Sequence, residues 1–142
     1  MLKDYIAAAL GVIGGAISAA FGGWTDGMKS LIIFMAIDYI SGLILAGIFK
    51  KSPKSDSGAL QSKAGLKGLF KKGVMLAIVY VAVRLDILMG TTFIRDATVI
   101  AFITNELISI IENAGLMGIP IPAPIKKAID LLKKQNDDKK ED

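Results

Sequence analysis

Apolar residues in this chain gather into long runs, and most of the charged residues lie between and after those runs. The longest run, residues 31–49 (LIIFMAIDYISGLILAGIF), carries a single ionisable side chain, Asp38, near its middle. About 20 largely apolar residues are enough to cross a bilayer as a helix. The pattern therefore predicts a membrane-spanning helix that holds an acid within its apolar length.

Three further stretches have the composition of spanning helices: residues 5–24, 73–94 and 97–113. The third spanning stretch along the chain, residues 73–94, contains Arg84 and Asp86. Because residues two apart on a helix point to different sides, each of these is expected to meet a partner on another helix or another chain. The fold class expected is an all-α integral membrane protein, with four transmembrane helices in residues 1–113 and a C-terminal amphipathic helix.

Small residues recur at every fourth position of the first stretch, at Gly11, Gly15 and Ala19, and again in the second at Gly42 and Ala46. Small side chains at this spacing let helices approach closely, and such packing drives helix association in lipid. We expect these residues to pack helices, although glycine and alanine are also simply common in membrane helices. A cleaved signal peptide is a second interpretation of the first stretch, and its full spanning length disfavours that interpretation.

Polar residues form a stripe at helical spacing along the fourth stretch: Asn105, Glu106, Ser109, and Glu112 or Asn113. Lipid cannot satisfy such groups, so the stripe must face protein or water. One hypothesis is that Asn105, Glu106, Ser109 and Asp38 face a seam between subunits or a water-filled lumen. The alternative, of equal weight, is an ion pair within one chain, such as Arg84 with Glu106 or Asp38.

Residues 50–72 form a basic loop, with seven lysines against the single acid Asp56. The positive-inside rule places this loop in the cytoplasm, and four spans then place both termini there. Lys63, Lys67 and Lys71 recur at four-residue spacing with apolar residues between them. They predict either a short basic amphipathic helix on the inner leaflet or a solvated loop.

Residues 114–142 begin with a proline-rich turn, which cannot be regular helix. An amphipathic helix follows, and its lysines, including Lys126 and Lys127, are expected to lie on the membrane surface. From Gln135 onward the tail is wholly polar and is expected to be disordered.

The net charge of +4 indicates anionic phospholipids rather than nucleic acid as partners, because the lysines flank the apolar runs. Cysteine and histidine are absent from the sequence, which excludes disulfides, thiol chemistry and imidazole metal ligands. No nucleophile–base pair or metal-ligand cluster accompanies the acids. We therefore expect neither an enzyme nor a cofactor or metal site.

Several short motifs together resemble the bacteriophage holin family, which also includes clostridial toxin-secretion holins. They are Asp38-Tyr39-Ile40-Ser41-Gly42, Ser62-Lys63-Ala64-Gly65-Leu66-Lys67-Gly68, Asp86, Arg95, the stretch from Asn105-Glu106 to Glu112-Asn113, and Gly118-Ile119-Pro120-Ile121-Pro122. The resemblance covers about residues 32–132. Its most specific part is the Asn-Glu…Ser-Ile…Glu-Asn pattern followed by Gly-x-Pro-x-Pro.

The resemblance implies a protein that accumulates in the bacterial cytoplasmic membrane and assembles with itself into lesions. Through these lesions an endolysin escapes and lyses the host cell, or a toxin is released. Two other functions remain open at this point. A small ion or proton channel or transporter is the first, because acids in spans also mark ion pathways, and a passive membrane scaffold is the second.

Overall fold

The computed structural model describes residues 1–138 and shows a helical protein. Within these residues there are five α-helices, one π-helical segment and no β-strand. In chain order the elements are α1 (Leu2–Ala20), α2 (Asp26–Ile44), the π-helical η1 (Leu45–Phe49), α3 (Ser62–Met89), α4 (Ile94–Leu116) and α5 (Ala123–Asp138). The all-α fold class is therefore confirmed.

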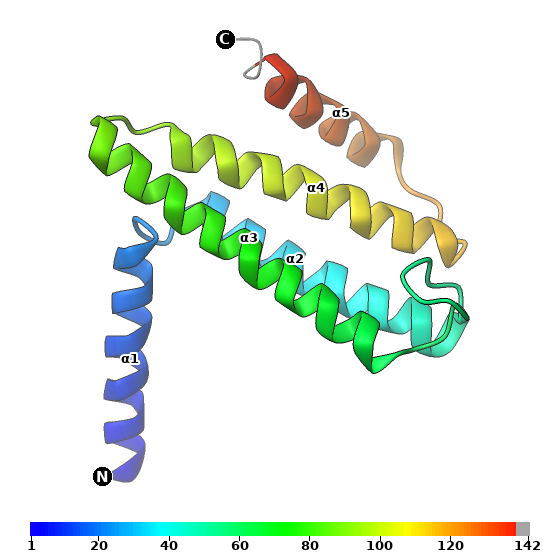
Figure 1. The fold of residues 1–142 in the computed structure, drawn as a ribbon, viewed down its shortest axis with the longest axis horizontal. Coiled ribbons are helices and arrows are strands. Elements are labelled where there is room, and N and C mark those ends of the chain that lie inside the picture. The colour runs from blue at the N-terminus through cyan, green and yellow to red at the C-terminus, as the bar shows by residue number, and fades with distance from the viewer. Residues whose placement is uncertain (139–142) are drawn as a thin grey trace.

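Helices α2, α3 and α4 form a three-helix bundle in which α4 packs against both of the others (Figure 1). The buried apolar side chains at its centre are Met28, Leu31, Met35, Met75, Val79, Val99 and Ile103. Leu31 and Val79 have no exposed surface. In water such burial stabilises a fold through the hydrophobic effect, whereas in lipid the same contacts act through close packing.

α3 is longer than the spanning stretch expected at residues 73–94. It begins at Ser62, inside the stretch predicted to be a basic loop, so only residues 50–61 are irregular. Lys63, Lys67 and Lys71 lie on the first turns of this continuous helix rather than on a separate one. α2 contacts this part of α3: the Tyr39 hydroxyl donates a hydrogen bond to the Gly65 carbonyl oxygen at 3.3 Å.

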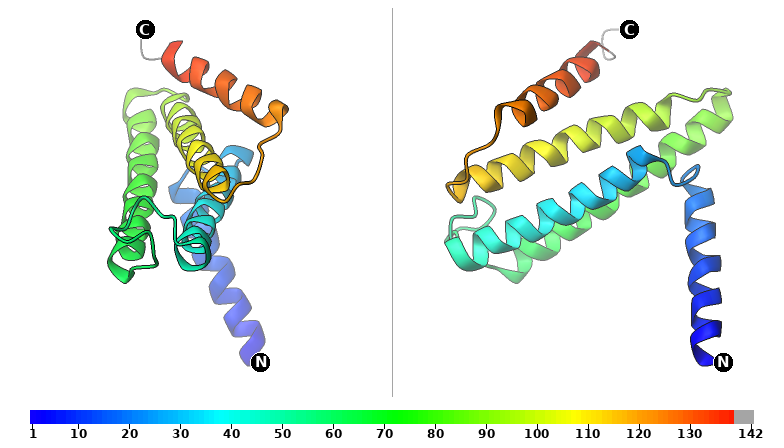
Figure 2. Two further views of the ribbon diagram at one scale, coloured as in Figure 1. Left: turned by 90° about the vertical axis from the view of Figure 1, so that its right-hand side faces the viewer. Right: turned by 180° about the vertical axis from the view of Figure 1, so that it is seen from behind.

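α1 projects away from the bundle, with the N-terminus at its far end (Figures 1 and 2). None of its residues is buried. The chain turns between α1 and α2 at Gly22 and Gly23, whose φ angles are 79° and 98°. Side chains with a Cβ rarely adopt this region, so the turn depends on glycine.

α5 lies alongside α4 (Figure 2). Ile129 is buried, Leu132 packs against the bundle core, and Asn136 Nδ2 donates to Thr104 Oγ1 at 3.2 Å. In the structure α4 covers the apolar face of this helix, and its expected place on a membrane surface stays a prediction. The tail predicted to be disordered from Gln135 is helical through Asp138, and its residues 139–142 lie outside the described part of the chain.

Three helical segments are long and apolar enough to cross a membrane: Leu2–Ala20, Asp26–Phe49 and Ile94–Leu116. α3 is not among them because charged residues are spread along it: Lys63, Lys67, Lys71, Lys72, Arg84 and Asp86. The fourth spanning helix therefore stays a prediction, and the other three agree with stretches that the sequence marks as spans.

Candidate functional site

Three charged side chains from three different helices meet inside the bundle. The Lys72 Nζ of α3 lies 2.7 Å from Asp38 Oδ2 of α2 and 2.7 Å from Glu106 Oε2 of α4. The side chains of Asp38, Glu106 and Lys72 are 5%, 2% and 14% exposed. Away from water such charges attract strongly, so these three residues, here called the ionic cluster, tie the three helices together.

Asn113 of α4 completes the polar contacts of the ionic cluster. Its Nδ2 donates to Asp38 Oδ1 at 3.2 Å, to the Asp38 carbonyl oxygen at 3.3 Å and to Ser41 Oγ at 2.9 Å. Ser41 Oγ in turn donates to the Asp38 carbonyl oxygen at 3.0 Å. A buried carboxylate is costly unless it is paired and hydrogen-bonded, and here Asp38 has both a cation and an amide donor.

The ionic cluster is self-contained within the part of the chain that the structure describes. Every buried side-chain nitrogen and oxygen in residues 1–138 has a hydrogen-bond partner, and those residues contain no group of three potential ligands placed to hold a metal ion. The chemistry that the cluster offers is therefore helix-to-helix attachment through charge pairing.

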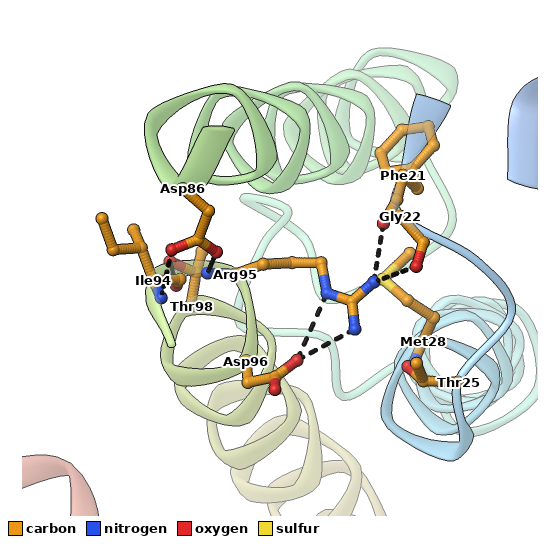
Figure 3. Close-up of polar contacts among 9 residues, drawn as sticks. All are labelled: Phe21, Gly22, Thr25, Met28, Asp86, Ile94, Arg95, Asp96 and Thr98. Carbon is orange, nitrogen blue, oxygen red and sulfur yellow. Dashed lines mark hydrogen bonds and ion pairs between the residues drawn. The ribbon is translucent and has the colours of Figure 1, made fainter. Parts of the chain in front are cut away.

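A second polar network lies where the turn between α3 and α4 meets the turn between α1 and α2 (Figure 3). Asp86, near the end of α3, accepts hydrogen bonds from the backbone N–H groups of Ile94 and Arg95 at 3.0 and 2.9 Å, and from Thr91 Oγ1 at 2.6 Å. Free N–H groups at a helix start carry partial positive charge and are stabilised by an acid. Asp86 thus caps α4 from a neighbouring helix.

The Arg95 side chain extends this network to the end of α1 (Figure 3). Its Nη1 donates to the carbonyl oxygens of Phe21 and Gly22 at 3.0 and 2.7 Å, while Nε and Nη2 donate to Asp96 Oδ1. A Cβ at Gly22 would lie 2.6 Å from Nη1 and would displace the guanidinium, and the backbone angle of Gly22 itself favours glycine. Arg95, together with the contact of the Phe21 ring with Tyr80, anchors the base of α1.

The structure places Asp38 and Glu106 inside a single chain, 3% and 2% exposed as whole residues. This arrangement agrees with the alternative of an ion pair within one chain, and a seam between subunits or a lumen stays a prediction. Their partner is Lys72 rather than Arg84, which is exposed and has no acid within ion-pair distance among residues 1–138. The polar stripe is divided: Asn105 and Glu112 are exposed, Ser109 is half-buried, and Asn113 is buried.

The other residues predicted from the sequence do not belong to the ionic cluster. A Cβ at Gly11 or Gly15 would meet nothing within 4 Å, and Ala19 is exposed. Gly42 lies near Asn113, where a Cβ would be 3.8 Å from Nδ2, and Ala46 is buried in η1. The lysines expected on the membrane surface are all exposed: Lys63, Lys67, Lys71, Lys126 and Lys127.

Sequence reasoning missed Lys72 and Arg95 as contact-forming residues. One signal could have found Lys72: it directly precedes the apolar stretch 73–94, and the two acids in neighbouring spans require a cation. Arg95 pairs with Asp96, its neighbour in the sequence, and its guanidinium also binds the carbonyl oxygens of the turn that follows α1.

Comparison with known proteins places most of the chain in one family. The model of the bacteriophage holin family matches residues 15–134. An uncharacterised protein of Halalkalibacterium halodurans is 36% identical over 128 residues, covering 86% of this chain and 89% of the relative. An uncharacterised 14.9 kDa protein from the nagH 3' region of Clostridium perfringens is 37% identical over 131 residues, covering 91% and 93%.

A probable holin of Bacillus phage phi105 is 32% identical over 112 residues, which cover 78% of this chain and 77% of the phage protein. No solved structure matches the chain significantly.

Proposed function

The chain belongs to the bacteriophage holin family, and from that premise we propose that it accumulates in the bacterial cytoplasmic membrane and assembles there into lesions. Many copies together form each lesion, which lets an endolysin, or a toxin, leave the cytoplasm. Anionic phospholipids surround the assembly and contact its exposed lysines. The chain is a membrane-permeabilising protein rather than an enzyme.

The observation that carries the assembly step is the isolation of α1. This helix is long and apolar enough to span a bilayer, yet its own chain buries none of its residues. Its glycines at positions 11, 14 and 15 have open space around them. Close helix packing through small residues is what drives association in lipid, so α1 is the element left free for neighbouring copies.

A single copy does not offer a passage for a folded enzyme. The space between α2, α3 and α4 is filled by their own side chains, and the ionic cluster closes it further. Bundles of this kind pack around a core rather than a channel. Release of a protein therefore requires several copies that enclose the passage between them.

The proposed orientation of the bundle in the membrane follows from the positions of the lysines. The start of α3, with Lys63, Lys67 and Lys71, lies at the same end of the bundle as the end of α4 (Figure 1). Basic segments next to spans stay on the cytoplasmic side. We place this end, and both termini, in the cytoplasm, and the Arg95 end on the outer side.

Inducible expression in bacteria tests the proposal. Viability should fall abruptly after the protein accumulates, and a cytoplasmic reporter enzyme should appear in the medium of cells that also produce an endolysin. The matched control is the chain without residues 2–20, which removes α1 and leaves the bundle. Continued growth with no enzyme release from cells whose membranes contain the full chain would contradict the proposal.

A small ion channel is the second candidate, favoured by the two acids and one lysine held together within the bundle. Such a channel would depolarise the membrane without releasing proteins. The size of what leaves the cell therefore separates the two functions.

A further inference from the structure

The position of α5 on α4 conflicts with a bilayer around α4. Asn136 meets Thr104 close to the midpoint of α4, so α5 covers the half of that helix that ends at Leu116. In this position α5 would share the membrane depth of a spanning helix. Its charged side chains in the described part of the chain are all exposed: Lys126, Lys127, Asp130, Lys133, Lys134, Asp137 and Asp138.

Hydrocarbon does not accept these charges. A single lysine or aspartate at the centre of a spanning helix shifts the insertion equilibrium by roughly a hundredfold against insertion. None of the α5 charges belongs to an ion pair within residues 1–138, so pairing does not reduce that penalty. α4 cannot have lipid around it and α5 docked on it at the same time.

α5 has the features of a helix that binds a membrane surface. Ile125, Ile129 and Leu132 follow one another at helical spacing on one face, and lysines flank that face. Residues 125–134 carry four lysines and one aspartate. Two contributions hold such helices on a membrane. Apolar side chains enter the boundary between headgroups and acyl chains, and lysines contact anionic lipid.

We infer that α5 has two alternative docking sites, the face of α4 at Thr104 and the surface of an anionic bilayer. When α4 is inserted, α5 leaves α4 and binds the bilayer surface. The face of α4 at Thr104 is then open to neighbouring molecules in the membrane. The inference rests on the proposed membrane insertion of α4. With a net charge of +3 over residues 125–134, an anionic surface favours the second site by roughly a hundredfold.

Chemical cross-linking of the full chain tests this directly, because the natural sequence has no cysteine. The double variant Thr104→Cys/Asn136→Cys places thiols on two residues whose natural side chains are in contact, with Oγ1 and Nδ2 3.2 Å apart. A short bifunctional thiol reagent should cross-link it within one chain in detergent. After reconstitution into vesicles rich in anionic lipid, the cross-linked fraction should fall at least tenfold.

The matched control is Gly27→Cys/Val99→Cys, in the α2–α4 contact away from α5, where a Cβ at position 27 lies 3.4 Å from Val99 Cγ1. Its cross-linking should be equal in detergent and in vesicles. A third chain adds Lys126→Gln, Lys127→Gln, Lys133→Gln and Lys134→Gln to the Thr104/Asn136 pair. These lysines are exposed, so the fold is kept. Cross-linking in anionic vesicles should rise above that of the Thr104/Asn136 pair alone, because the attraction to the anionic surface is lost while only the three acids of α5 still oppose docking.

Flotation of the vesicles after an alkaline wash distinguishes a failure of membrane insertion from a failure of the inference about α5. A chain that does not stay with the vesicles overturns the membrane insertion and the inference together. A chain that stays with them, yet keeps its Thr104/Asn136 cross-link while the control pair reacts normally, overturns only the inference.

Discussion

Lys72 joins α3 to both other helices of the bundle. One ammonium group serves two carboxylates from two other helices, each at 2.7 Å. The three helices therefore depend on a residue that contributes little apolar packing. Removing one partner of a buried charge group costs more than the pair itself contributes, because the remaining charges are left uncompensated.

Replacing Lys72 by methionine should destabilise the bundle by about 3–5 kcal/mol, because two adjacent carboxylates would remain without their cation. The measurement is denaturant or thermal unfolding of the detergent-solubilised protein. Lys71→Met is the matched control: Lys71 is the exposed neighbour on the same helix, so its loss should change stability by no more than about 0.5 kcal/mol. Equal effects of the two substitutions would contradict the role assigned to Lys72.

Neutralising the whole ionic cluster is a second test of the role of Lys72. The triple variant Asp38→Asn/Glu106→Gln/Lys72→Met has no charge left to compensate, so it should be more stable than Lys72→Met alone. The comparison uses the same unfolding assay. A triple variant that is less stable than the single one would show that the helices are held in some other way.

Asp86 provides a separate test at the other end of the bundle. Asp86→Ala removes the acceptor of three hydrogen bonds at the start of α4 and should cost about 1–3 kcal/mol. Asp96→Ala removes an exposed acid from the first turn of the same helix and should cost less than about 1 kcal/mol. Hydrogen exchange at the first turn of α4 should rise in the Asp86 variant and stay unchanged in the Asp96 variant.

At the scale of the helix, α1 and α5 differ from the bundle because neither is held by the ionic cluster. α1 is attached through Arg95 and the turn at Gly22, and α5 through a single buried isoleucine, Leu132 and one side-chain hydrogen bond. Elements with few buried contacts are those that open first. Both are therefore the elements available for contacts outside the chain.

Gly15→Ile should leave the monomer intact and weaken assembly about tenfold, because the added side chain meets nothing in its own chain but prevents close approach of another helix. The measurement is the fraction of oligomer seen after cross-linking in membranes. Ala9→Ile adds similar bulk about 120° around α1 from Gly15 and should have little effect. If both variants assemble as well as the natural chain, α1 is not the assembly helix.

Much of this architecture could be predicted from hydrophobic patterning. The spanning helices at residues 5–24, 31–49 and 97–113 correspond to α1, α2 with η1, and α4, because length and apolar composition decide helix formation in a membrane protein. The start of α3 was misplaced by the charge pattern. Clustered lysines indicate a cytoplasmic loop when membrane topology is predicted from sequence, although lysine itself is a good helix former.

Two features could not be predicted because they depend on tertiary contacts. Lys72 is 34 residues from both Asp38 and Glu106, and only the packing of three helices brings these residues together. The amphipathic pattern of α5 predicts an apolar face but does not say whether lipid or another helix covers that face. In the structure α4 covers it.

At the scale of the whole molecule, the chain divides into a bundle that satisfies its own polar groups and two peripheral helices. The acids of the bundle are paired inside it. We propose that lesions require contacts between copies, so that permeability belongs to the assembly and not to the single chain.

The most direct measurement uses the purified chain reconstituted into anionic vesicles that contain both a small dye and a folded enzyme. Our account predicts that the two are released together, that release rises steeply with the number of chains per vesicle, and that Gly15→Ile suppresses release of both while Ala9→Ile does not. Release of the dye alone, in proportion to the number of chains, would contradict the account and indicate a channel formed by one copy.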